Sequence, residues 1–322
     1  MIIVRSPFRL PIAGGGTDLD FYYKKRGGDL ISATIDQYIY ILISKRPLDK
    51  KILIQNTETQ FANNIKVVKN KLFKEVLKQL GLKKGIQIAN ISTLPTQSGL
   101  GSSSTLTVGL IKGLLKMKKL QINKNNLAKF AYKIERQKLK FDGGWQDQII
   151  ASYGGIQRIK ISKKGIFKSN HVKINKVNLL KLQRHFILVY TNEIRNSEKI
   201  ITEQRKNHRE IVQNYDIIKS KVKIMEKFLK RGNVAQIGKI FHDHWLEKKK
   251  LTKNMSNQKL NKIYEKMMKS KMFYGGKIIG AGGGGFFLMA SKYPLKASKF
   301  LKKNRLEFTK IKFDHLGATI IS

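Results

Sequence analysis

Residues 94–104, which read LPTQSGLGSSS, are the most informative stretch of the chain because an apolar helical pattern follows them directly. Glycines allow backbone N–H groups to approach a ligand closely, and a helix start adds unpaired donors and the positive end of its dipole. The stretch therefore predicts a phosphate-binding loop. It differs from the Walker pattern, since no lysine follows a glycine in the required place. Taken alone, the loop is explained equally well as a helix N-cap with a flexible lead-in.

Two further glycine-rich loops favour the ligand-binding interpretation. Residues 13–18, AGGGTD, follow Arg9 and end in Asp18. In a binding site, Asp18 would hold substrate hydroxyls and Arg9 would face an anion; the alternative is a hairpin in which Asp18 is an ordinary turn residue. Residues 280–285, GAGGGG, join two apolar segments. Four consecutive glycines exceed the needs of a turn, so we expect their backbone to approach a ligand or another loop.

Two carboxylates occupy positions that helical periodicity would bury. Glu135 continues a four-residue apolar spacing, and Asp147 lies three and four residues before Ile150 and Ala151. Burying an ionised carboxylate is costly unless a cation pairs with it. Structural ion pairs with neighbouring basic residues would satisfy that need. Beside a phosphate loop, however, the two carboxylates indicate a magnesium site and a general base, because Mg²⁺ prefers oxygen ligands such as Glu135 and a loop serine.

The composition limits the classes to which the chain can belong. A length of 322 residues with 41% hydrophobic residues predicts a folded protein with room for two domains. The absence of cysteine excludes disulfides, thiolate metal sites and cysteine nucleophiles. The N-terminus lacks the apolar region of a secretory signal, and the most hydrophobic later stretch is too short to span a bilayer. We therefore expect a cytoplasmic protein without a membrane partner.

The charge is strongly positive, since 65 Lys and Arg residues face 21 Asp and Glu residues and give +44 at pH 7. Such a field attracts polyanions. The basic residues are scattered through every segment, however, and no aromatic-interleaved nucleic-acid motif is present. We interpret the charge as background composition and expect no specific nucleic-acid partner. A basic nucleic-acid-binding protein is the alternative from a different functional class.

Hydrophobic patterning predicts strands over the first sixty residues and alternating helices and strands afterwards. Gly109 and Gly113 lie within one expected helix and would permit it to pack closely on a sheet. The expected strands cover residues 1–7, 31–43, 51–55, 85–91, two segments within 155–175, 186–191, 277–279, 286–289 and 307–313. The expected helices cover residues 71–80, 103–117, 126–139, 146–153, 197–229, 234–246, 258–270 and 296–303.

In combination, these motifs resemble the GHMP small-molecule kinases. The shared order is Pro-x-x-x-Gly-Leu-Gly-Ser-Ser, a Glu-Arg pair on the next helix, Gln-Asp-Gln after Gly-Gly, and a glycine-rich strand connection near the C-terminus. Within that family, residues 13–18, 33–36, 134–136, 147–148 and 275–286 resemble the heptose 7-phosphate kinases. The likeness covers essentially the whole chain. It implies an α+β fold with a ribosomal-protein-S5-like α/β domain over residues 1–170 and a ferredoxin-like α+β domain over residues 171–322.

The resemblance also implies an activity, two cofactors and a set of roles. The activity is ATP-dependent phosphorylation of the anomeric (C1) hydroxyl of D-glycero-D-manno-heptose 7-phosphate to the 1,7-bisphosphate, for nucleotide-activated heptose in capsule, lipopolysaccharide or S-layer glycan synthesis. The cofactors are ATP and Mg²⁺, and the sugar phosphate and ATP are the expected partners. Another GHMP sugar kinase, such as an L-fucose kinase, is the alternative. Whether the protein is a monomer or a homodimer is left open.

By the same resemblance, Asp147 is the catalytic base, and Arg9 is the cation that keeps it ionised. Ser103 and Glu135 are the magnesium ligands. The ATP phosphates would be bound by Pro95, Ser98, Gly99, Leu100, Gly101, Ser102, Ser103 and Ser104. The sugar would be bound by Gly15, Gly16, Thr17, Asp18, Gly282, Gly283 and Gly284.

The chain departs from the heptose kinase pattern at two positions. Trp145 stands where Lys is usual, and Asn192 stands where Gly usually follows Tyr-Thr. Because Trp145 precedes the expected base by two residues, we expect it to affect sugar recognition more than transfer chemistry.

Two basic motifs remain outside the expected site. We do not expect His242 and His244 to bind a metal together, since residues two apart on a helix face different directions. Residues 248–250 are three lysines that we interpret as a solvated helix face, with one of them a candidate for reaching a substrate phosphate. If the sugar carries a 7-phosphate, some lysine or arginine must hold it.

Overall fold

Two long paired strands, β1 (Ile2–Ala13) and β2 (Gly28–Lys45), form the centre of the larger sheet in the computed structural model, which describes residues 1–95, 98–193 and 197–322. They run antiparallel from the pair Ile2–Ile43 to the pair Ala13–Ile31. The expectation that the first strand ends at a turn near Pro7 is wrong. Pro7 and Pro11 have no backbone N–H to donate to the neighbouring strand. The register of the β1–β2 pair is irregular after each of them, and β1 continues to Ala13.

The larger sheet has the strand order β13-β1-β2-β5-β3-β4, with β12 and the β6–β7 hairpin also attached along β2. All pairs are antiparallel except β3 with β5. The strands are β3 (Ile52–Gln55), β4 (Thr59–Ala62), β5 (Ile86–Ser92), β6 (Ile156–Ile161), β7 (Phe167–His171), β12 (Phe313–Asp314) and β13 (Thr319–Ile320).

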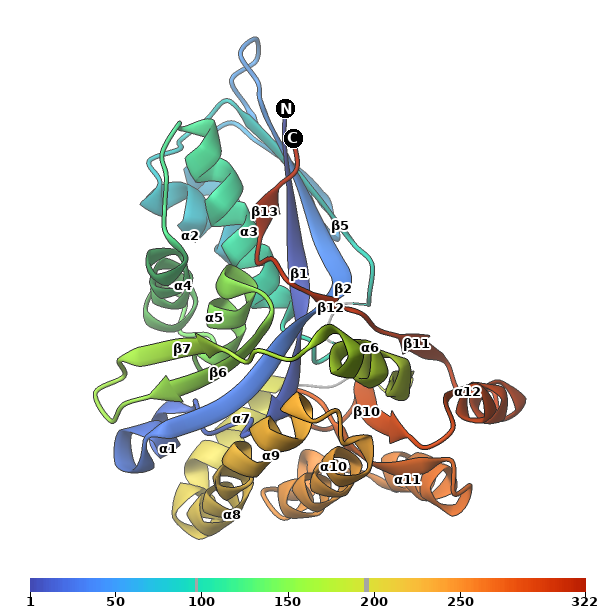
Figure 1. Ribbon diagram of the computed structural model, residues 1–322. Coiled ribbons are helices and arrows are strands. Elements are labelled where there is room, and N and C mark those ends of the chain that lie inside the picture. Colours follow the sequence, from blue (N-terminus) through green and yellow to red (C-terminus); the bar gives the residue numbers. More distant parts are fainter. Residues whose placement is uncertain (96–97, 194–196) are drawn as a thin grey trace.

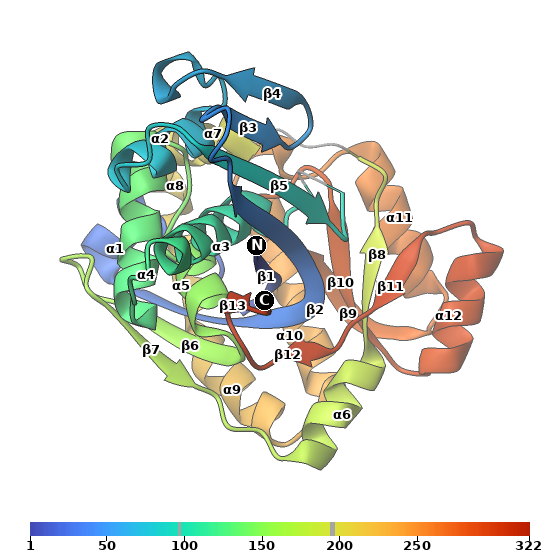
Figure 2. The ribbon, with the colours of Figure 1, turned by 90° about the horizontal axis from the view of Figure 1, so that it is seen from above.

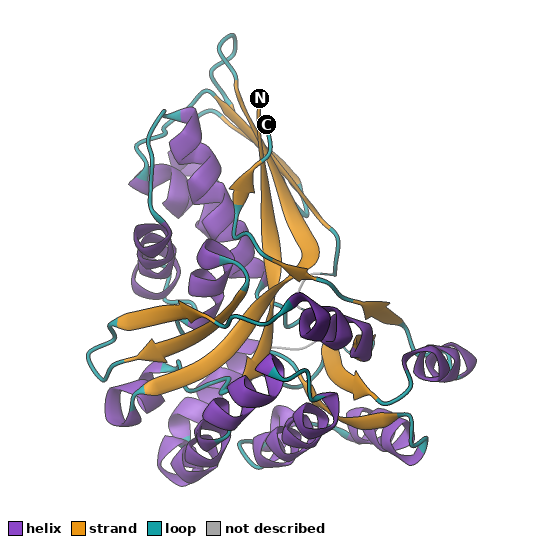
Figure 3. Ribbon diagram, viewed as in Figure 1, coloured by secondary structure: helices purple, strands orange, loops and turns teal. Residues whose placement is uncertain are grey.

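Helices α2 (Lys71–Gln79), α3 (Ser102–Met117), α4 (Lys124–Tyr132) and α5 (Gln146–Tyr153) gather on one side of this sheet (Figure 1, Figure 3). Helix α3 packs directly on β1 and β2. A Cβ atom at Gly109 or Gly113 would lie 2.6 Å from the Cδ1 atom of Ile41 or Ile43, so only glycine permits this approach. The predicted close packing is therefore confirmed.

The expected helix over residues 126–139 is not uniform. After α4, the chain continues as a π-helical turn, Lys133–Lys138. Such turns widen the helix locally and alter the direction in which later side chains point. Glu135 lies within this turn and is fully buried.

A smaller antiparallel sheet has the order β11-β8-β10-β9 and lies beside the larger one (Figure 2). Its strands are β8 (Phe186–Tyr190), β9 (Phe273–Ile278), β10 (Phe286–Ser291) and β11 (Phe308–Lys310). The helices around it are α6 (Lys176–His185), α10 (Val234–Lys249), α11 (Gln258–Lys269) and α12 (Pro294–Lys303). Helix α10 packs closely on β9.

The single helix expected over residues 197–229 is three helices, α7 (Ser197–Lys206), α8 (His208–Ser220) and α9 (Val222–Lys230). A continuous helix of that length would extend about 50 Å. The breaks allow α8 to contact α1 (Asp20–Arg26) while α9 contacts α10 and β2. Two single 3₁₀ turns, Ile65–Val67 and Lys253–Met255, complete the described elements.

The C-terminal residues return to the N-terminal sheet. The strand expected over residues 307–313 is divided between β11 of the smaller sheet and β12 of the larger one. Strand β13 then pairs with β1, which places the two chain ends close together (Figure 2). A division of the chain near residue 170 stays a prediction, and the last strands belong to the sheet of the first part.

None of the helices in the described ranges is both long and apolar enough to cross a membrane.

Candidate active site

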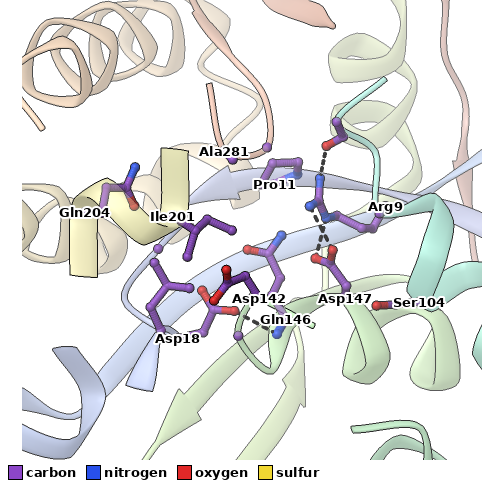
Figure 4. A pocket seen from close by; sticks show the side chains of 18 of the residues that line it. Arg9, Pro11, Asp18, Ser104, Asp142, Gln146, Asp147, Ile201, Gln204 and Ala281 are labelled. Carbon is purple, nitrogen blue, oxygen red and sulfur yellow. Dashed lines mark hydrogen bonds and ion pairs between the residues drawn. The ribbon is translucent and has the colours of Figure 1, made fainter. Parts of the chain in front are cut away.

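A cavity of about 740 Å³ lies where the three glycine-rich loops meet (Figure 4). The loop before α3, the loop after β1 and the loop after β9 all contribute to its wall, together with the N-terminal turn of α5 and one face of α10. The wall includes Arg9, Asp18, Gly99, Gly101, Ser102, Ser103, Ser104, Asp147, Gly280 and Ala281. The sequence-predicted loops therefore come together around one space.

Arg9 and Asp147 form a two-point ion pair at this cavity (Figure 4). The Nε atom of Arg9, from β1, donates to Oδ1 of Asp147 at 2.6 Å, and a terminal nitrogen donates to Oδ2 at 3.0 Å. The third nitrogen of Arg9 donates to the carbonyl of Gly99. The arginine thus ties the phosphate loop to the first turn of α5.

Gly101 makes this arrangement possible. It caps α3 in the left-handed conformation, with a φ of 79°. A Cβ atom there would lie 3.0 Å from Oδ2 of Asp147 and 3.1 Å from Cγ of Arg9. Glycine is therefore required both by the backbone conformation and by the ion pair beside it.

Glu135 lies one layer behind the phosphate loop and has no exposed surface. Ser103 and Ser104 donate from their hydroxyls to its two carboxylate oxygens, each at 2.6 Å. Gln148 donates to the same carboxylate, and Arg136 lies 3.9 Å from it. Ser103 and Ser104 also line the cavity, so the Glu135 carboxylate is separated from the cavity by these two serines.

This donor set fits Mg²⁺. The Ser103 hydroxyl and a Glu135 oxygen are adjacent hard oxygen donors beside a phosphate loop, and Mg²⁺ takes few protein ligands and completes its shell with phosphates and water. The described residues contain no group of three His, Cys, Asp or Glu side chains placed to hold a metal.

Asp18 is buried at the opposite end of the cavity wall from the phosphate loop (Figure 4). Its Oδ2 accepts a hydrogen bond from the backbone N–H of Gln146 at 2.9 Å. Burial raises the pKa of Asp18, and the Asp147 charge adds to this effect while the Gln146 hydrogen bond opposes it. A carboxyl group with a free oxygen on a cavity wall can accept hydrogen bonds from hydroxyl groups. Gly144 leaves the space for it, since a Cβ there would lie 2.0 Å from the same oxygen.

Some predicted site residues do not line the cavity. Pro95 is exposed on the surface, and Ser98 and Leu100 are loop residues that are buried. The hydroxyl of Thr17 donates to backbone carbonyls. Thr96 and Gln97 lie outside the described residues. Among the residues after β9, Gly280 and Ala281 line the cavity, whereas Gly282, Gly283 and Gly284 do not.

The last glycine loop instead contacts other loops. Gly283 donates from its backbone to the carbonyl of Met255, and Gly285 lies against the backbone carbonyl of Ser98. The prediction that this loop packs beside the phosphate loop is thus supported by the contact at Gly285.

Three basic residues lie on the cavity wall: His244 and Lys277, which were not assigned from the sequence, and Lys248, which was one of three lysines considered as a contact to a substrate phosphate. The interpretation of Lys248 as part of a solvated face is wrong, because it is only 8% exposed and its ammonium donates to the carbonyl of Gly280. Spacing offered a signal, since His244 and Lys248 follow the buried Phe241 by three and seven residues on α10.

The two histidines on α10 face different surroundings. His244 lines the cavity, whereas the Nδ1 atom of His242 lies 2.7 Å from the Tyr264 hydroxyl.

Trp145 points away from the cavity. Its ring stacks on Tyr132 with a centroid separation of 3.4 Å and contacts Phe167 at 5.4 Å. Trp145 is not among the residues that line the cavity in the described part of the chain. In this chain the position therefore contributes to packing between α4 and β7.

A glycine-rich anion loop on a helix start, a buried glutamate behind its serines and an ion-paired aspartate across the same cavity define a phosphotransferase site of the nucleotide-dependent kinase class. Residues 65–155 match the GHMP kinases N terminal domain. The chain is also 31% identical, over 324 residues, to D-glycero-alpha-D-manno-heptose 7-phosphate kinase of Campylobacter jejuni, a match that covers 95% of this chain and 94% of the relative. The chain therefore belongs to the GHMP kinases.

Solved structures share the fold at lower identity. A D-glycero-D-manno-heptose 1-phosphate kinase from Bacteroides thetaiotaomicron has a TM-score of 0.82 at 22% identity and covers 100% of this chain and 99% of that one. Lactococcus lactis galactokinase in complex with galactose has a TM-score of 0.74 at 18% identity, with coverage of 99% and 94%. The mixed α and β architecture is thus that of GHMP kinases. The protein is a GHMP sugar kinase, a class of phosphotransferase that uses ATP as the phosphate donor.

Proposed function

We propose that this sugar kinase phosphorylates the anomeric hydroxyl of D-glycero-D-manno-heptose 7-phosphate to give the 1,7-bisphosphate, as a step towards nucleotide-activated heptose. The observation that carries the proposal is the convergence of the phosphate loop, the Arg9–Asp147 pair and Asp18 around one cavity. The similarity to a heptose 7-phosphate kinase over nearly the whole chain supports this sugar over others.

Asp147 is the proposed general base. Phosphoryl transfer depends mainly on in-line positioning and charge neutralisation, and the base accepts the proton of the attacking hydroxyl. Arg9 binds both oxygens of Asp147 and offsets its charge. The sugar would lie between Asp147 and Asp18, where Asp18 and the backbone of Gly15 and Gly16 hold its other hydroxyls.

The loop before α3 is the proposed site for the ATP phosphates. Its cavity-facing members are Gly99, Gly101, Ser102, Ser103 and Ser104. Ser103 and Glu135 would hold Mg²⁺, which neutralises phosphate charge when it is bound with the nucleotide. The remaining serine, Ser104, keeps Glu135 in position through its hydrogen bond. We assign these parts to an N-terminal domain over residues 1–170 and the last glycine loop to a C-terminal domain over residues 171–322.

The experiment that tests the proposed function is ATP consumption by the purified protein against a panel of sugars and sugar phosphates. The position of the new phosphate is then read by NMR. We expect D-glycero-D-manno-heptose 7-phosphate to give the highest kcat/KM and the new phosphate to lie on C1. A preference for an unphosphorylated sugar such as L-fucose, or a phosphate on another carbon, would contradict the assignment.

A further inference from the structure

We propose that His244, Lys248 and Lys277 form the site that binds the phosphate ester already carried by the sugar substrate. This inference rests on the proposed function, because only a phosphorylated acceptor brings such a group into the cavity. All three residues line the cavity and are buried, and they come from α10 and β9.

Lys277 is the central observation. Its side chain is 1% exposed, although lysine is almost never buried without a partner. Its ammonium lies over the ring of Phe241, 5.5 Å from the centroid. Within the described ranges it has no hydrogen-bond acceptor and no ion-pair partner. A buried ammonium that lines a cavity and lacks an anion is suited to an anion that arrives with a ligand.

Helix α10 supplies the neighbouring groups. Phe241, His244 and Lys248 share one helix face, which packs on β9 and presents His244 and Lys248 to the cavity beside Lys277. The Lys248 ammonium donates to the carbonyl of Gly280, in the loop that follows Lys277. This contact fixes the loop and keeps the positive charge of Lys248 at the cavity wall.

The other basic residues of the cavity are already committed. Of the described residues that line it, only Arg9, Arg136, Lys248 and Lys277 are lysines or arginines. Arg9 is bound to Asp147 and to the Gly99 carbonyl. Arg136 donates to backbone carbonyls on its own side of the site and lies beside Glu135. Among the lysines and arginines that line the cavity in the described part of the chain, Lys277 is therefore the one whose charge is available to a second phosphate.

The protonation of this cluster gives phosphate binding at the site a pH signature. Burial, followed by repulsion from Arg9, lowers the pKa of Lys277 to about 7. Burial also lowers the pKa of His244 well below its ordinary value, and Lys277 and Lys248 contribute. The groups facing Lys277 are thus Arg9 from β1, which is paired with Asp147, and His244 and Lys248 from α10. A phosphate would favour the ammonium form of Lys277, so its binding should weaken as the pH rises above about 7.

The test is the selectivity of the enzyme for phosphorylated over unphosphorylated acceptor. We compare kcat/KM for D-glycero-D-manno-heptose 7-phosphate and for D-glycero-D-manno-heptose in wild type, Lys277→Met and Lys248→Met. Methionine keeps the length of the side chain and removes its charge. Loss of a charge-assisted phosphate contact should lower the ratio of the two kcat/KM values by about 10- to 100-fold in Lys277→Met. The matched control, Lys239→Met on the exposed side of α10, should keep the wild-type ratio.

A conservative variant separates charge from packing. In Lys277→Arg the side chain stays charged at all working pH values, so the KM for the sugar phosphate should no longer rise between pH 7 and pH 9 as it does in wild type. Heat stability of each variant is followed by thermal unfolding, and Lys248→Met gives a second measurement of the ratio if Lys277→Met does not fold.

The outcomes distinguish the sources of the phosphate. If Lys277 served the transferring phosphoryl group of ATP, both acceptors would lose activity equally and the ratio would stay at the wild-type value; that result overturns this inference and leaves the proposed function standing. A wild-type enzyme that uses only unphosphorylated sugars would overturn the proposed function and this site together. A lowered ratio in both methionine variants, with the control unchanged, supports the site.

Discussion

Among single residues, Glu135 imposes the strictest requirement on the site. It is fully buried, and its carboxylate is held by two serine hydroxyls and the Gln148 amide, with a guanidinium 3.9 Å away. This arrangement keeps a negative charge directly behind the phosphate loop. A buried charge is costly unless a cation offsets it, and the proposed cation is the Mg²⁺ bound to the nucleotide phosphates.

Glu135→Gln should raise the Mg²⁺ concentration needed for half-maximal activity. Glutamine retains hydrogen-bonding atoms for Ser103 and Ser104 but removes the charge, so the nucleotide-bound cation loses one ionic ligand. Activity measured across a Mg²⁺ titration checks this, with Glu58→Gln, an exposed carboxylate, as the control. An unchanged magnesium dependence would remove Glu135 from the proposed ligand set.

Some residues of the site were predicted from the amino-acid sequence and others were not. Arg9, Asp18, Glu135 and Asp147 were predicted because each lies in a motif or at an apolar helical position. Lys277 was not, because a lysine in a strand is usually a surface residue, and only the packing of α10 on β9 buries it. Burial by distant elements is a property of the assembled fold that no local pattern contains.

Among the elements, α3 determines how the phosphate loop meets the sheet. Its start was predicted within one residue, since the loop glycines and the apolar spacing mark it clearly. Helix α5 was predicted with its observed bounds for the same reason, because Gly143 and Gly144 precede it and Gly154 follows it. In contrast, the breaks between α7, α8 and α9 were missed, since apolar spacing continues through them and the breaks follow from contacts with α1, β2 and α10.

Gly113→Val should destabilise the protein by about 1–3 kcal/mol, since the added side chain overpacks the contact between α3 and the sheet. The first added carbon alone would lie 2.6 Å from Cδ1 of Ile43 and 2.7 Å from Cγ2 of Val4. Urea unfolding of the variant and wild type measures the difference. The exposed position Lys116 on the same helix provides the control, and Lys116→Ala should change stability by less than about 0.5 kcal/mol. Equal stability of Gly113→Val and wild type would contradict the close packing.

At the scale of the whole molecule, the chain combines two sheets with a very high positive charge. Strands β12 and β13 return to the first sheet, so the chain ends support the part of the molecule that contains the phosphate loop. Sequence alone predicted neither β13 nor a separate β12, because so short a segment carries no periodicity and depends on the edge that it joins. The charge of +44 is a property of composition and is spread over all parts of the chain.

The protein should bind DNA weakly and without sequence preference, with an affinity that falls steeply as salt rises. Scattered lysines attract phosphates through counterion release, which added salt opposes. Fluorescence anisotropy with two unrelated duplexes, measured from low to physiological salt, checks this expectation. Tight binding to one duplex that persists at physiological salt would favour a specific nucleic-acid role.

The most direct test of the account is phosphoryl transfer by Asp147→Ala, followed by rapid quench under single-turnover conditions with heptose 7-phosphate. If Asp147 takes the proton of the sugar hydroxyl, the rate should fall by roughly two to four orders of magnitude, while the Kd for ATP, measured by titration, stays close to that of wild type. Transfer at a rate near that of wild type would show that the reaction does not pass through Asp147, and the proposed arrangement of the site would be wrong.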